Sequence, residues 1–547
     1  MPSPCSVLLK SHCLKLVRAC FVVVVVAIPA LPEALANAAE APSVAAKVAG
    51  FDILEYVVEG NTVLSAIAIE RAVYPYLGPG RNLSDVEKAR TDLEKAYHDA
   101  GYLTVAVDIP EQQVKGGLVT IKVIEGKVER LKVSGNRYSL RSDIRAGVPS
   151  LAPETVPNFS EVQDQLGRLA SADRQVAPLL RPGRQPGTVE VELAVDDKLP
   201  IHGSVELNNK QSPDTSVGRL EASLRYQNLW QRQHSLGLGW SVSPQDMTEV
   251  NILSMFYGMP VGRSGDSLSL YYVHSSSNIA SVASSGVAGK GDTLGLRYVA
   301  PLRGIGSFTH QLLAGFDFKD LQENTTLVGT DTSSKPLRYM PLALQYSGAF
   351  QGESGSLEFN LGATLGFRPL MEQQVLCDGQ QRDQFDCRRR GASGNFAVVR
   401  GDLAYRQRFG AWGLLVRAEG QISSQPLVSP EQFTAGGFDS VRGYLESEAL
   451  GDKGLRLRFE LAAPPVVPAG GQFSMTPHIF YDGASLYVIE ALPEQKDHFM
   501  LSSIGLGFRL VGGKNWLANV EGAHTLHAGP RTEKGYQRGL LSFKYQF

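Results

Sequence analysis

The sequence predicts an outer-membrane β-barrel preceded by a mixed α/β region, and three observations carry this prediction. The chain opens with the pattern of a signal peptide, alternates apolar and polar residues from about residue 199 onward, and ends inside an alternating stretch. One face of the last strand is apolar and comprises Leu541, Phe543, Tyr545 and Phe547. An unpaired strand edge invites aggregation, and closing the last strand against the first removes that edge, as a membrane requires.

Residues 1–36 have the organisation of a signal peptide. Basic residues precede an apolar run from Ala19 to Leu31, and small residues that would suit a signal peptidase follow at 34–38. An uncleaved anchor is the alternative, but the run contains prolines and is clearly shorter than the roughly 20 residues that a spanning helix needs. No other apolar run could span as a helix, which suits a barrel whose apolar residues are diluted by alternation.

Residues 51–126 and 127–198 are expected to be two α+β units in tandem. The turn at Val58-Glu59-Gly60-Asn61 is echoed by Val133-Ser134-Gly135-Asn136, which indicates a repeat. In the first unit, Ser84-Asp85-Val86-Glu87 is expected to be a capping box that opens a helix. The other expected elements are helices at 139–148 and 160–170 and strands at 51–58, 103–109, 118–124, 176–180 and 188–195.

Residues 199–547 are expected to form the transmembrane β-barrel, because helical periodicity vanishes there. Short connections alternate with long ones, as periplasmic turns alternate with extracellular loops. Trp230, Trp412 and Trp516 sit at short turns, as in an interfacial aromatic belt, although ordinary turn packing is the alternative. A soluble β-sandwich is the rival fold. The sixteen expected strands lie near 202–210, 217–229, 234–243, 249–259, 267–276, 292–301, 309–320, 336–350, 356–368, 395–409, 413–424, 455–463, 472–489, 501–511, 516–527 and 536–547.

Composition excludes several classes of protein. The net charge is -2 with a pI near 6.6, so the chain has no nucleic-acid footprint. Three of the five cysteines lie in the signal peptide, and the other two, Cys377 and Cys387, are expected to form a disulfide that closes a surface loop. Two free thiols are the alternative. No metal site, cofactor or catalytic constellation is expected, since no ligand or catalytic spacing stands out.

The longest loop, at about 425–454, carries the most informative motif. Arg442 stands beside Gly443 within Gly436 to Tyr444, so the backbone could approach the barrel wall and direct the guanidinium inward. The thirteenth strand offers a carboxylate partner at Asp482. A shielded arginine–carboxylate pair would hold the loop inside the lumen. A solvated loop with an incidental arginine is the alternative.

At this point the sequence resembles the two-partner-secretion outer-membrane transporters, or haemolysin secretion/activation proteins, which are barrels preceded by POTRA (polypeptide-transport-associated) domains. The resemblance covers nearly all of the mature chain. It rests on the two repeats, the sixteen strands, Val441-Arg442-Gly443-Tyr444, Phe480-Tyr481-Asp482 and the aromatic carboxy terminus. It implies that Arg442 meets Asp482 inside the barrel, with the barrel in the outer membrane and the POTRA domains in the periplasm.

Two departures from the family pattern matter. The family places a glycine two residues after the aspartate, whereas here Gly483 follows Asp482 directly and Ala484 comes next. Family members often begin with a helix that plugs the pore, but residues 37–50 span at most about 21 Å as a helix and leave no linker. We therefore expect 37–50 to be a short linker, with the plug helix absent or vestigial and the sixth loop the main obstruction.

The resemblance implies export of a large secreted protein of the adhesin or cytolysin type, received unfolded by the POTRA domains and conducted through the barrel. The periplasm lacks ATP and the sequence shows no phosphate-binding loop, so folding outside the cell is the expected energy source. Leu118–Ile124 and Thr188–Val195 are the expected sheet edges for docking by strand addition.

Outer-membrane lipid and the barrel-assembly machinery are the other expected partners. The cysteine pair is expected to be dispensable for transport. The alternatives are an insertase of the same superfamily and a passive pore.

Overall fold

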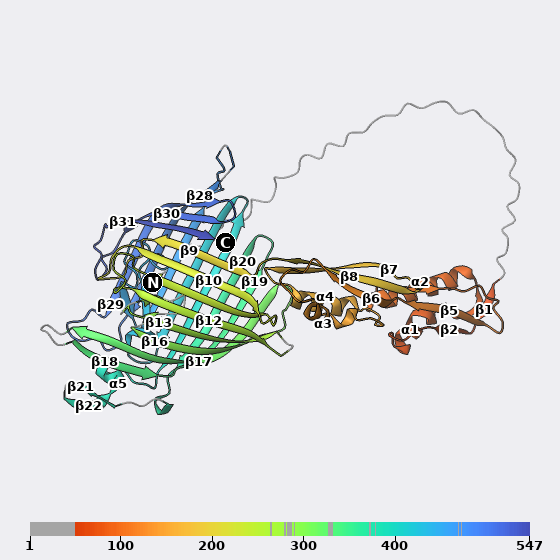
Figure 1. Cartoon of the computed structure of the whole chain (residues 1–547), viewed down its shortest axis with the longest axis horizontal. Coiled ribbons are helices and arrows are strands. Elements are labelled where there is room, and N and C mark those ends of the chain that lie inside the picture. Colours follow the sequence, from red (N-terminus) through yellow and green to blue (C-terminus); the bar gives the residue numbers. More distant parts are fainter. Residues whose placement is uncertain are drawn as a thin grey trace, which may run out of the picture.

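The computed structural model describes residues 50–262, 265–277, 280–281, 287–288, 290–326, 332–370, 374–377, 379–468, 470–471 and 473–547. An elongated α+β region is attached to one end of a β-barrel (Figure 1). The signal peptide expected at 1–36 and the short linker expected at 37–50, with the plug helix absent or vestigial, lie outside the described residues except for Gly50. In the part of the chain that is described, no helix is both long and apolar enough to cross a membrane.

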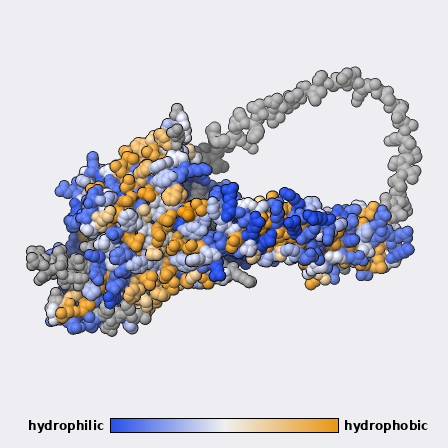
Figure 2. All heavy atoms as spheres, in the orientation of Figure 1, coloured by the Kyte–Doolittle hydropathy of each residue, from blue (hydrophilic) through white to orange (hydrophobic). Residues whose placement is uncertain are grey.

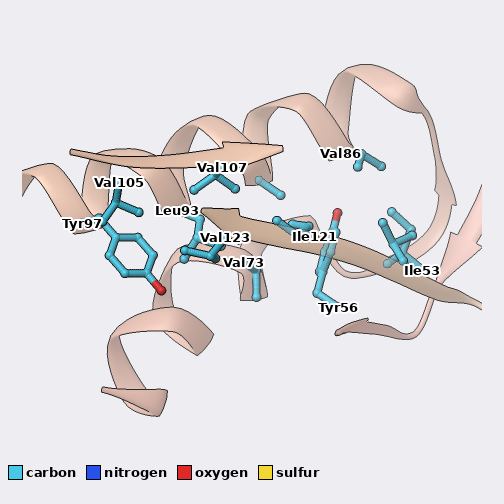
Figure 3. Packing of buried hydrophobic residues seen from close by; sticks show 12 residues of the cluster. Ile53, Tyr56, Val73, Val86, Leu93, Tyr97, Val105, Val107, Ile121 and Val123 are labelled. Atoms are coloured by element: carbon cyan, nitrogen blue, oxygen red, sulfur yellow. The ribbon is translucent and has the colours of Figure 1, made fainter. Parts of the chain in front are cut away.

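The first α+β unit packs helices on a small sheet. Its elements are β1 (Phe51–Ile53), β2 (Glu55–Glu59), α1 (Ala66–Val73), η1 (Tyr74–Tyr76), β3 (Gly78–Arg81), α2 (Leu83–Asp99), β4 (Val105–Asp108) and β5 (Leu118–Glu125). Helix α2 buries Val86, Ala89, Leu93 and Tyr97, which recur at helical spacing, against side chains of the sheet (Figure 3). Burial of this apolar face holds the helix on the sheet.

The capping box of α2 differs from the sequence prediction. The N-cap is Asn82, whose side chain accepts from the Asp85 backbone N–H, while the Asp85 carboxylate accepts from the Asn82 N–H. Ser84 therefore lies inside the first turn, and the prediction of a box at Ser84–Glu87 is wrong. An asparagine satisfies the free amides of a helix start as well as a serine does.

The second unit repeats the arrangement of the first. Its elements are β6 (Lys127–Ser134), α3 (Arg141–Ala146), η2 (Pro149–Leu151), α4 (Phe159–Leu169), β7 (Arg174–Pro182) and β8 (Thr188–Asp197). The strand orders are β2-β5-β4 and β6-β8-β7, with one parallel and one antiparallel pair in each sheet. Gly60 and Gly135 occupy equivalent turns with φ of +89° and +82°, where a side chain would be strained.

The expected docking edges are wrong. Strands β5 and β8, which contain Leu118–Ile124 and Thr188–Val195, are the central strands of their sheets and are paired on both sides. In each three-stranded sheet, the strand that comes last in the sequence lies between the other two. The outer strands of these two sheets are therefore β2, β4, β6 and β7, and the edge of β6 is already hydrogen-bonded at Val128 to Glu154 and Thr155.

Both joints of the α+β region are hydrogen-bonded. Between the units, the Phe159 N–H donates to the Gly101 carbonyl at 2.8 Å, so the start of α4 abuts the end of α2. Between the second unit and the barrel, the Gln231 side chain donates to the Tyr138 carbonyl at 3.0 Å and accepts from the Leu140 N–H at 3.2 Å. Gln231 belongs to the first periplasmic turn of the barrel. These contacts place the second unit at the barrel mouth.

The barrel is a closed antiparallel sheet of sixteen strands, as the sequence predicts. The elements are β9 (Ile201–Asn208), β10 (Arg219–Leu229), β11 (His234–Val242), β12 (Asn251–Val261), β13 (Asp266–Ser275), β16 (Gly291–Pro301), β17 (Phe308–Thr326), β18 (Thr332–Tyr339), β19 (Leu342–Gln351), β20 (Gly355–Leu365), β23 (Ala397–Phe409), β24 (Trp412–Ser423), β27 (Lys453–Ala462), β28 (Phe473–Tyr487), β29 (His498–Gly512), β30 (Trp516–Thr525) and β31 (Gln537–Gln546). Together β18 and β19 form one strand, interrupted at Met340 and Pro341, because both pair with β17.

The last strand closes the barrel against the first. Strand β31 pairs antiparallel with β9, from Ser542 opposite Asn208 to Gln546 opposite Ser204. The backbone of Phe547 exchanges two hydrogen bonds of 3.0 Å with Gly203. Apolar side chains gather on the outside of the barrel (Figure 2). The alternation of the sequence thus places apolar residues where a membrane would contact them.

We predict opposite effects for two glycine substitutions in the second unit. Gly135→Ala should destabilise it by about 1–3 kcal/mol, because the new Cβ would lie 2.3 Å from the Val195 carbonyl oxygen at a positive φ. Gly167→Ala, inside α4 with open space around it, should stabilise the unit by about 0.5–1 kcal/mol. Thermolysin cleavage rates of the periplasmic region in the full-length protein measure both effects. Equal protection of the two variants would contradict the assignment of the Gly135 turn.

Candidate functional site

The sixth extracellular loop, residues 424–452 between β24 and β27, folds into the barrel. Its elements are η4 (Ser429–Glu431), β25 (Phe433–Ala435) and β26 (Ala449–Gly451), and the two strands form a ribbon. Val441 and Tyr444 of the loop are buried in one apolar cluster with Ala484, Leu486 and Leu501 of the barrel wall. The loop is therefore packed against the inner faces of β28 and β29.

Glycines let the loop approach the wall. Gly436, Gly437 and Gly443 have φ of +111°, +106° and +97°, a region that side chains rarely adopt. A Cβ on Gly443 would lie 3.2 Å from the side chains of Ala523 and Thr525 on β30. The sequence-based expectation that a glycine beside Arg442 allows close approach matches this geometry.

Arg442 and Asp482 meet inside the barrel. The guanidinium binds the carboxylate at two points, with Nε 2.7 Å from Oδ2 and Nη2 2.9 Å from Oδ1. The Arg442 backbone N–H also donates to Oδ2, at 3.1 Å. The two residues are 1% and 0% exposed. A bidentate pair shielded from water is strong and geometrically specific.

Phe480 completes the immediate surroundings of Arg442. Its ring centre lies 3.4 Å from the guanidinium carbon, a cation–π arrangement. Phe480 and Asp482 are two residues apart on β28 and therefore face the lumen together. The thirteenth-strand motif thus contributes both a carboxylate and an aromatic surface.

Further charged residues surround the pair and were missed by sequence reasoning. Nη1 of Arg442 lies 3.3 Å from Glu460 Oε2 and 3.4 Å from Glu521 Oε1. Burial opposes the charge on Arg442, but the hydrogen bond to Asp482 and these carboxylates raise its pKa above the usual value. The carboxylates have second partners in Arg458, Arg509 and His478.

These residues come from four strands, so sequence spacing alone does not bring them together. The signal that the sequence does offer is the alternation, along a strand, of residues that face the lumen with residues that face outward. Arg456, Arg458 and Glu460 alternate with apolar residues in β27, as His478, Phe480 and Asp482 do in β28. Charged residues on the inward face of neighbouring strands would have pointed to a polar lumen site.

Tyr444 fastens the loop on the other side of the motif. Its hydroxyl lies 2.7 Å from the His527 carbonyl and 3.0 Å from the Ser502 carbonyl. Nη1 of Arg538, on the last strand, donates to the Tyr444 carbonyl at 2.9 Å. Val441, Arg442, Gly443 and Tyr444 therefore all contact the wall.

We call Glu446 to Glu448 the tip of the sixth loop. These residues contact the first extracellular loop, between β9 and β10, and the eighth, between β30 and β31. Glu448 is buried and accepts from the backbone N–H groups of Arg531 and Thr532 at 3.0 and 2.7 Å. The Glu446 N–H donates to the Gln211 carbonyl at 2.8 Å. These contacts span the two sides of the β9–β31 closure.

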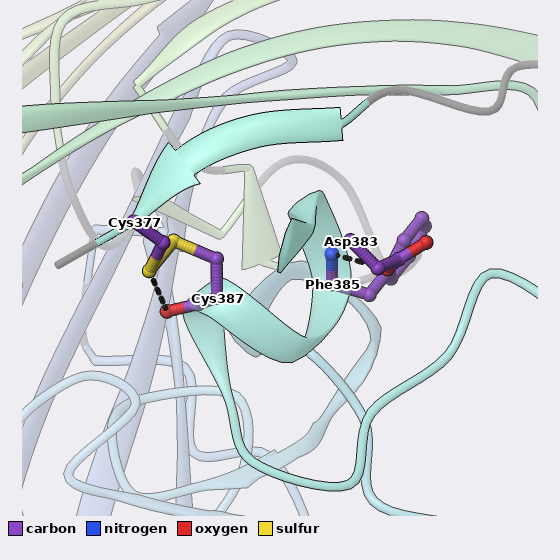
Figure 4. Close-up of a disulfide and its surroundings, with 4 residues drawn as sticks. All are labelled: Cys377, Asp383, Phe385 and Cys387. Atoms are coloured by element: carbon purple, nitrogen blue, oxygen red, sulfur yellow. Dashed lines mark hydrogen bonds between the residues drawn. A yellow bond between two sulfur atoms is a disulfide. The ribbon is translucent and has the colours of Figure 1, made fainter. Parts of the chain in front are cut away.

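Cys377 and Cys387 are joined by a disulfide (Figure 4). The bond lies in the fifth extracellular loop, residues 366–396, which contains β21 (Gln374–Cys377), β22 (Gln380–Asp383) and α5 (Gln384–Arg388). This loop lies at the end of the barrel opposite the α+β region (Figure 1). Among the described residues, no group of His, Cys, Asp and Glu could hold a metal ion.

We predict that acid strengthens docking of the loop tip. Burial raises the pKa of Glu446 to about 7, although the Phe438 N–H and Lys210 act in the opposite direction. A released Glu446 would titrate near its ordinary value, so the docked state binds a proton between about pH 5 and pH 7. Glu446→Gln should therefore be more protected than the wild type at pH 8 and similar at pH 5. The ratio of their cleavage rates in the sixth loop at each pH measures this, and a ratio independent of pH would contradict it.

Comparison with known proteins agrees with this architecture. Residues 187–510 match the family model described as haemolysin secretion/activation protein ShlB/FhaC/HecB, and residues 51–126 match the POTRA domain, ShlB-type. The outer membrane transporter CdiB of Dickeya dadantii is 25% identical over 412 residues, which cover 71% of this chain and 67% of that protein. CdiB of Escherichia coli is 24% identical over 440 residues, covering 75% and 69%.

Solved structures show the same fold. CdiB from Escherichia coli superposes with a TM-score of 0.63 at 18% identity, covering 93% of each chain. BamA from Haemophilus ducreyi, lacking POTRA domains 1–3, gives a TM-score of 0.54 at 12% identity, covering 91% of this chain and 100% of that chain. Because the family model matches more than half of its residues, this chain belongs to the haemolysin secretion/activation family of two-partner-secretion outer-membrane transporters.

Proposed function

We propose that this protein exports an unfolded secreted partner through the barrel lumen, without ATP. The observation that carries the proposal is a lumen occupied by a loop that is held by reversible contacts, above all those between Arg442 and Asp482. A loop so held can leave the lumen when a polypeptide enters. The cargo is proposed to be a large exoprotein of the haemolysin or adhesin type.

We further propose that residues 127–198 are a second POTRA domain, completing the order signal peptide 1–36, linker 37–50, POTRA domain 51–126 and barrel 199–547. The repeated strand order supports this assignment. The hydrogen bonds of Gln231 to the second unit support a receiving position at the pore mouth. A partner bound there would lie next to the lumen.

Strand addition to the POTRA domains requires an edge with free N–H groups. Strand β7 carries Pro178 and Pro182, which cannot donate, and β4 is only four residues long. We therefore assign the docking template to the edge of β2 and to the edge of β6 beyond Val128, whose own N–H already donates to the Thr155 carbonyl. Folding of the cargo outside the cell would make transfer directional, since the sequence has no phosphate-binding loop.

Two further partners belong to the proposal. The apolar outer surface of the barrel would contact outer-membrane lipid (Figure 2). The barrel-assembly machinery would insert the chain into that membrane. Neither partner requires a cofactor.

Comparison of culture medium and surface proteins with and without this gene tests the export function. We expect the loss of one or two large exoproteins, with other outer-membrane barrels unchanged, because a dedicated exporter serves few partners. A broad fall in many barrels would instead identify an insertase. Re-expression of the wild-type chain should restore the secreted profile.

Arg442→Ala should reduce secretion at least about tenfold while leaving the barrel assembled. Truncating one partner of a buried pair costs about 3–5 kcal/mol, so the loop loses its defined place on the barrel wall, which we propose that transport requires. Secreted partner in the medium is the readout, and heat-modifiable migration reports assembly. Arg408→Ala, at an exposed site by a short turn, serves as the matched control. Normal secretion by Arg442→Ala would show that the pair is a structural remnant.

A further inference from the structure

We propose that the disulfide-closed fifth extracellular loop is a clasp that holds both ends of the sixth loop at the barrel rim. We define the clasp as Arg389 with the disulfide of Cys377 and Cys387, acting on Asp452. With its base held, the sixth loop moves as a hinged flap that returns to the lumen after each opening. The inference rests on the proposed export function only in requiring that the loop can leave the lumen.

One guanidinium joins three loops. Nη1 and Nη2 of Arg389 bind Oδ1 and Oδ2 of Asp452 at 2.5 and 2.6 Å. Nη1 also donates to the Leu427 carbonyl at 2.7 Å, and Nη2 donates to the Ile489 carbonyl at 2.9 Å. Leu427 and Asp452 lie at the beginning and the end of the sixth loop, and Ile489 belongs to the seventh. Arg389 therefore joins the first and the last segments of the sixth loop. We call these segments, near Leu427 and Asp452, the two legs of the loop and together its base.

Asp452 makes its own hydrogen bonds to the beginning of the sixth loop and to the seventh loop. Its carboxylate is fully buried and accepts from the Leu427 N–H at 2.9 Å and the Ile489 N–H at 2.7 Å. The Gln432 side chain donates to Oδ1 at 3.2 Å. Removing Arg389 would leave a buried carboxylate without its cation, which is strongly unfavourable. The base of the loop would then loosen.

A second cluster of charged residues, around Glu431, holds the first leg of the sixth loop in place. Glu431 accepts from Lys319 Nζ at 2.6 Å, from Arg400 Nη2 at 3.2 Å and from the Tyr339 hydroxyl at 2.8 Å. Burial alone would raise the pKa of Glu431, but Lys319 and Arg400 lower it to about 2. The leg is thus held by a permanently ionised group. Its anchors lie on barrel strands and in the clasp, separate from the Arg442 site.

The disulfide stabilises the segment that presents Arg389. Cys387 lies in α5, two residues before Arg389, and its bond to Cys377 ties α5 to the β21–β22 hairpin. Phe385, on the same helix, is buried in one apolar cluster with Leu427 and Val428 of the sixth loop. Closing the hairpin limits the conformations of α5 and Arg389 when they are not docked.

The clasp and the Arg442 site act on different parts of one loop. When Arg442 is released, the middle and the tip of the sixth loop become free to move. The clasp still holds the base of the loop, near Leu427 and Asp452, at the barrel rim. Both ends of the loop stay covalently joined to β24 and β27, and the clasp shortens the segment that is free to move. A shorter free segment returns to its lumen site at a higher effective concentration, so openings should be brief. Without the clasp, the released loop should stay out of the lumen longer.

Single-channel recording of the purified full-length protein in planar bilayers, without cargo, tests this inference. Arg442→Ala releases the middle of the loop, and Arg442→Ala with Arg389→Ala also releases the base. We expect open dwell times at least about tenfold longer in the double variant, since each lost bond involves a charged group. Arg442→Ala with Arg390→Ala, which removes the exposed neighbouring arginine, should match Arg442→Ala alone.

Reduction of the disulfide provides a second measurement on protein that is already assembled. A phosphine reductant should lengthen the openings of Arg442→Ala and add little to those of the Arg389 double variant, because both changes disable one clasp. Unchanged dwell times on reduction, or equal dwell times in the two variants, would overturn the inference. Secretion assays of Arg442→Ala judge the export function separately, because the recordings contain no cargo.

Discussion

The charge on Arg442 is the constraint around which the inside of the barrel is arranged. A guanidinium taken out of water must be paired and hydrogen-bonded. Three carboxylates from three strands supply those partners, and Arg458, Arg509 and His478 compensate them in turn. The network gives the sixth loop one well-defined place on the wall while keeping every contact non-covalent. That combination suits the proposed exit of the loop from the lumen during export.

The extracellular loops extend this arrangement to the rim. The first and eighth loops hold the tip of the sixth loop through Gln211 and Glu448. The fifth and seventh hold its base through Arg389 and Asp452. The groups near the tip, the middle and the base differ in chemistry: the Glu446 carboxylate, whose pKa burial raises, near the tip, a bidentate ion pair in the middle and a disulfide-supported arginine at the base. Each can therefore respond to a different condition.

The periplasmic side is organised by repetition. Two units with the same sheet order are joined by a hydrogen bond from Phe159, at the start of α4, to Gly101, just after α2, and the second unit is hydrogen-bonded to a barrel turn by Gln231. The turn has positive φ at Asn228, Trp230, Gln231 and Gln233, a conformation that persists only where its surroundings support it. Contact with the second unit supplies such support. The α+β region is thus attached at a defined point of the barrel mouth.

The sequence alone predicted the barrel, its sixteen strands and the Arg442–Asp482 candidate pair, because the alternation of residues and the arginine followed by Gly443 are local features that can be recognised without the fold. It misplaced the capping box of α2, since Asn82 and Ser84 are both good helix caps. It also assigned the wrong strands to the edges of the sheets, because the alternation of residues within a strand does not reveal the order of the strands in a sheet. Only the tertiary structure joined Arg389 to Asp452 and brought Glu460 and Glu521 to Arg442. Those partners are distant in the chain and meet only when barrel closure sets the register of neighbouring strands and packs the loops over them.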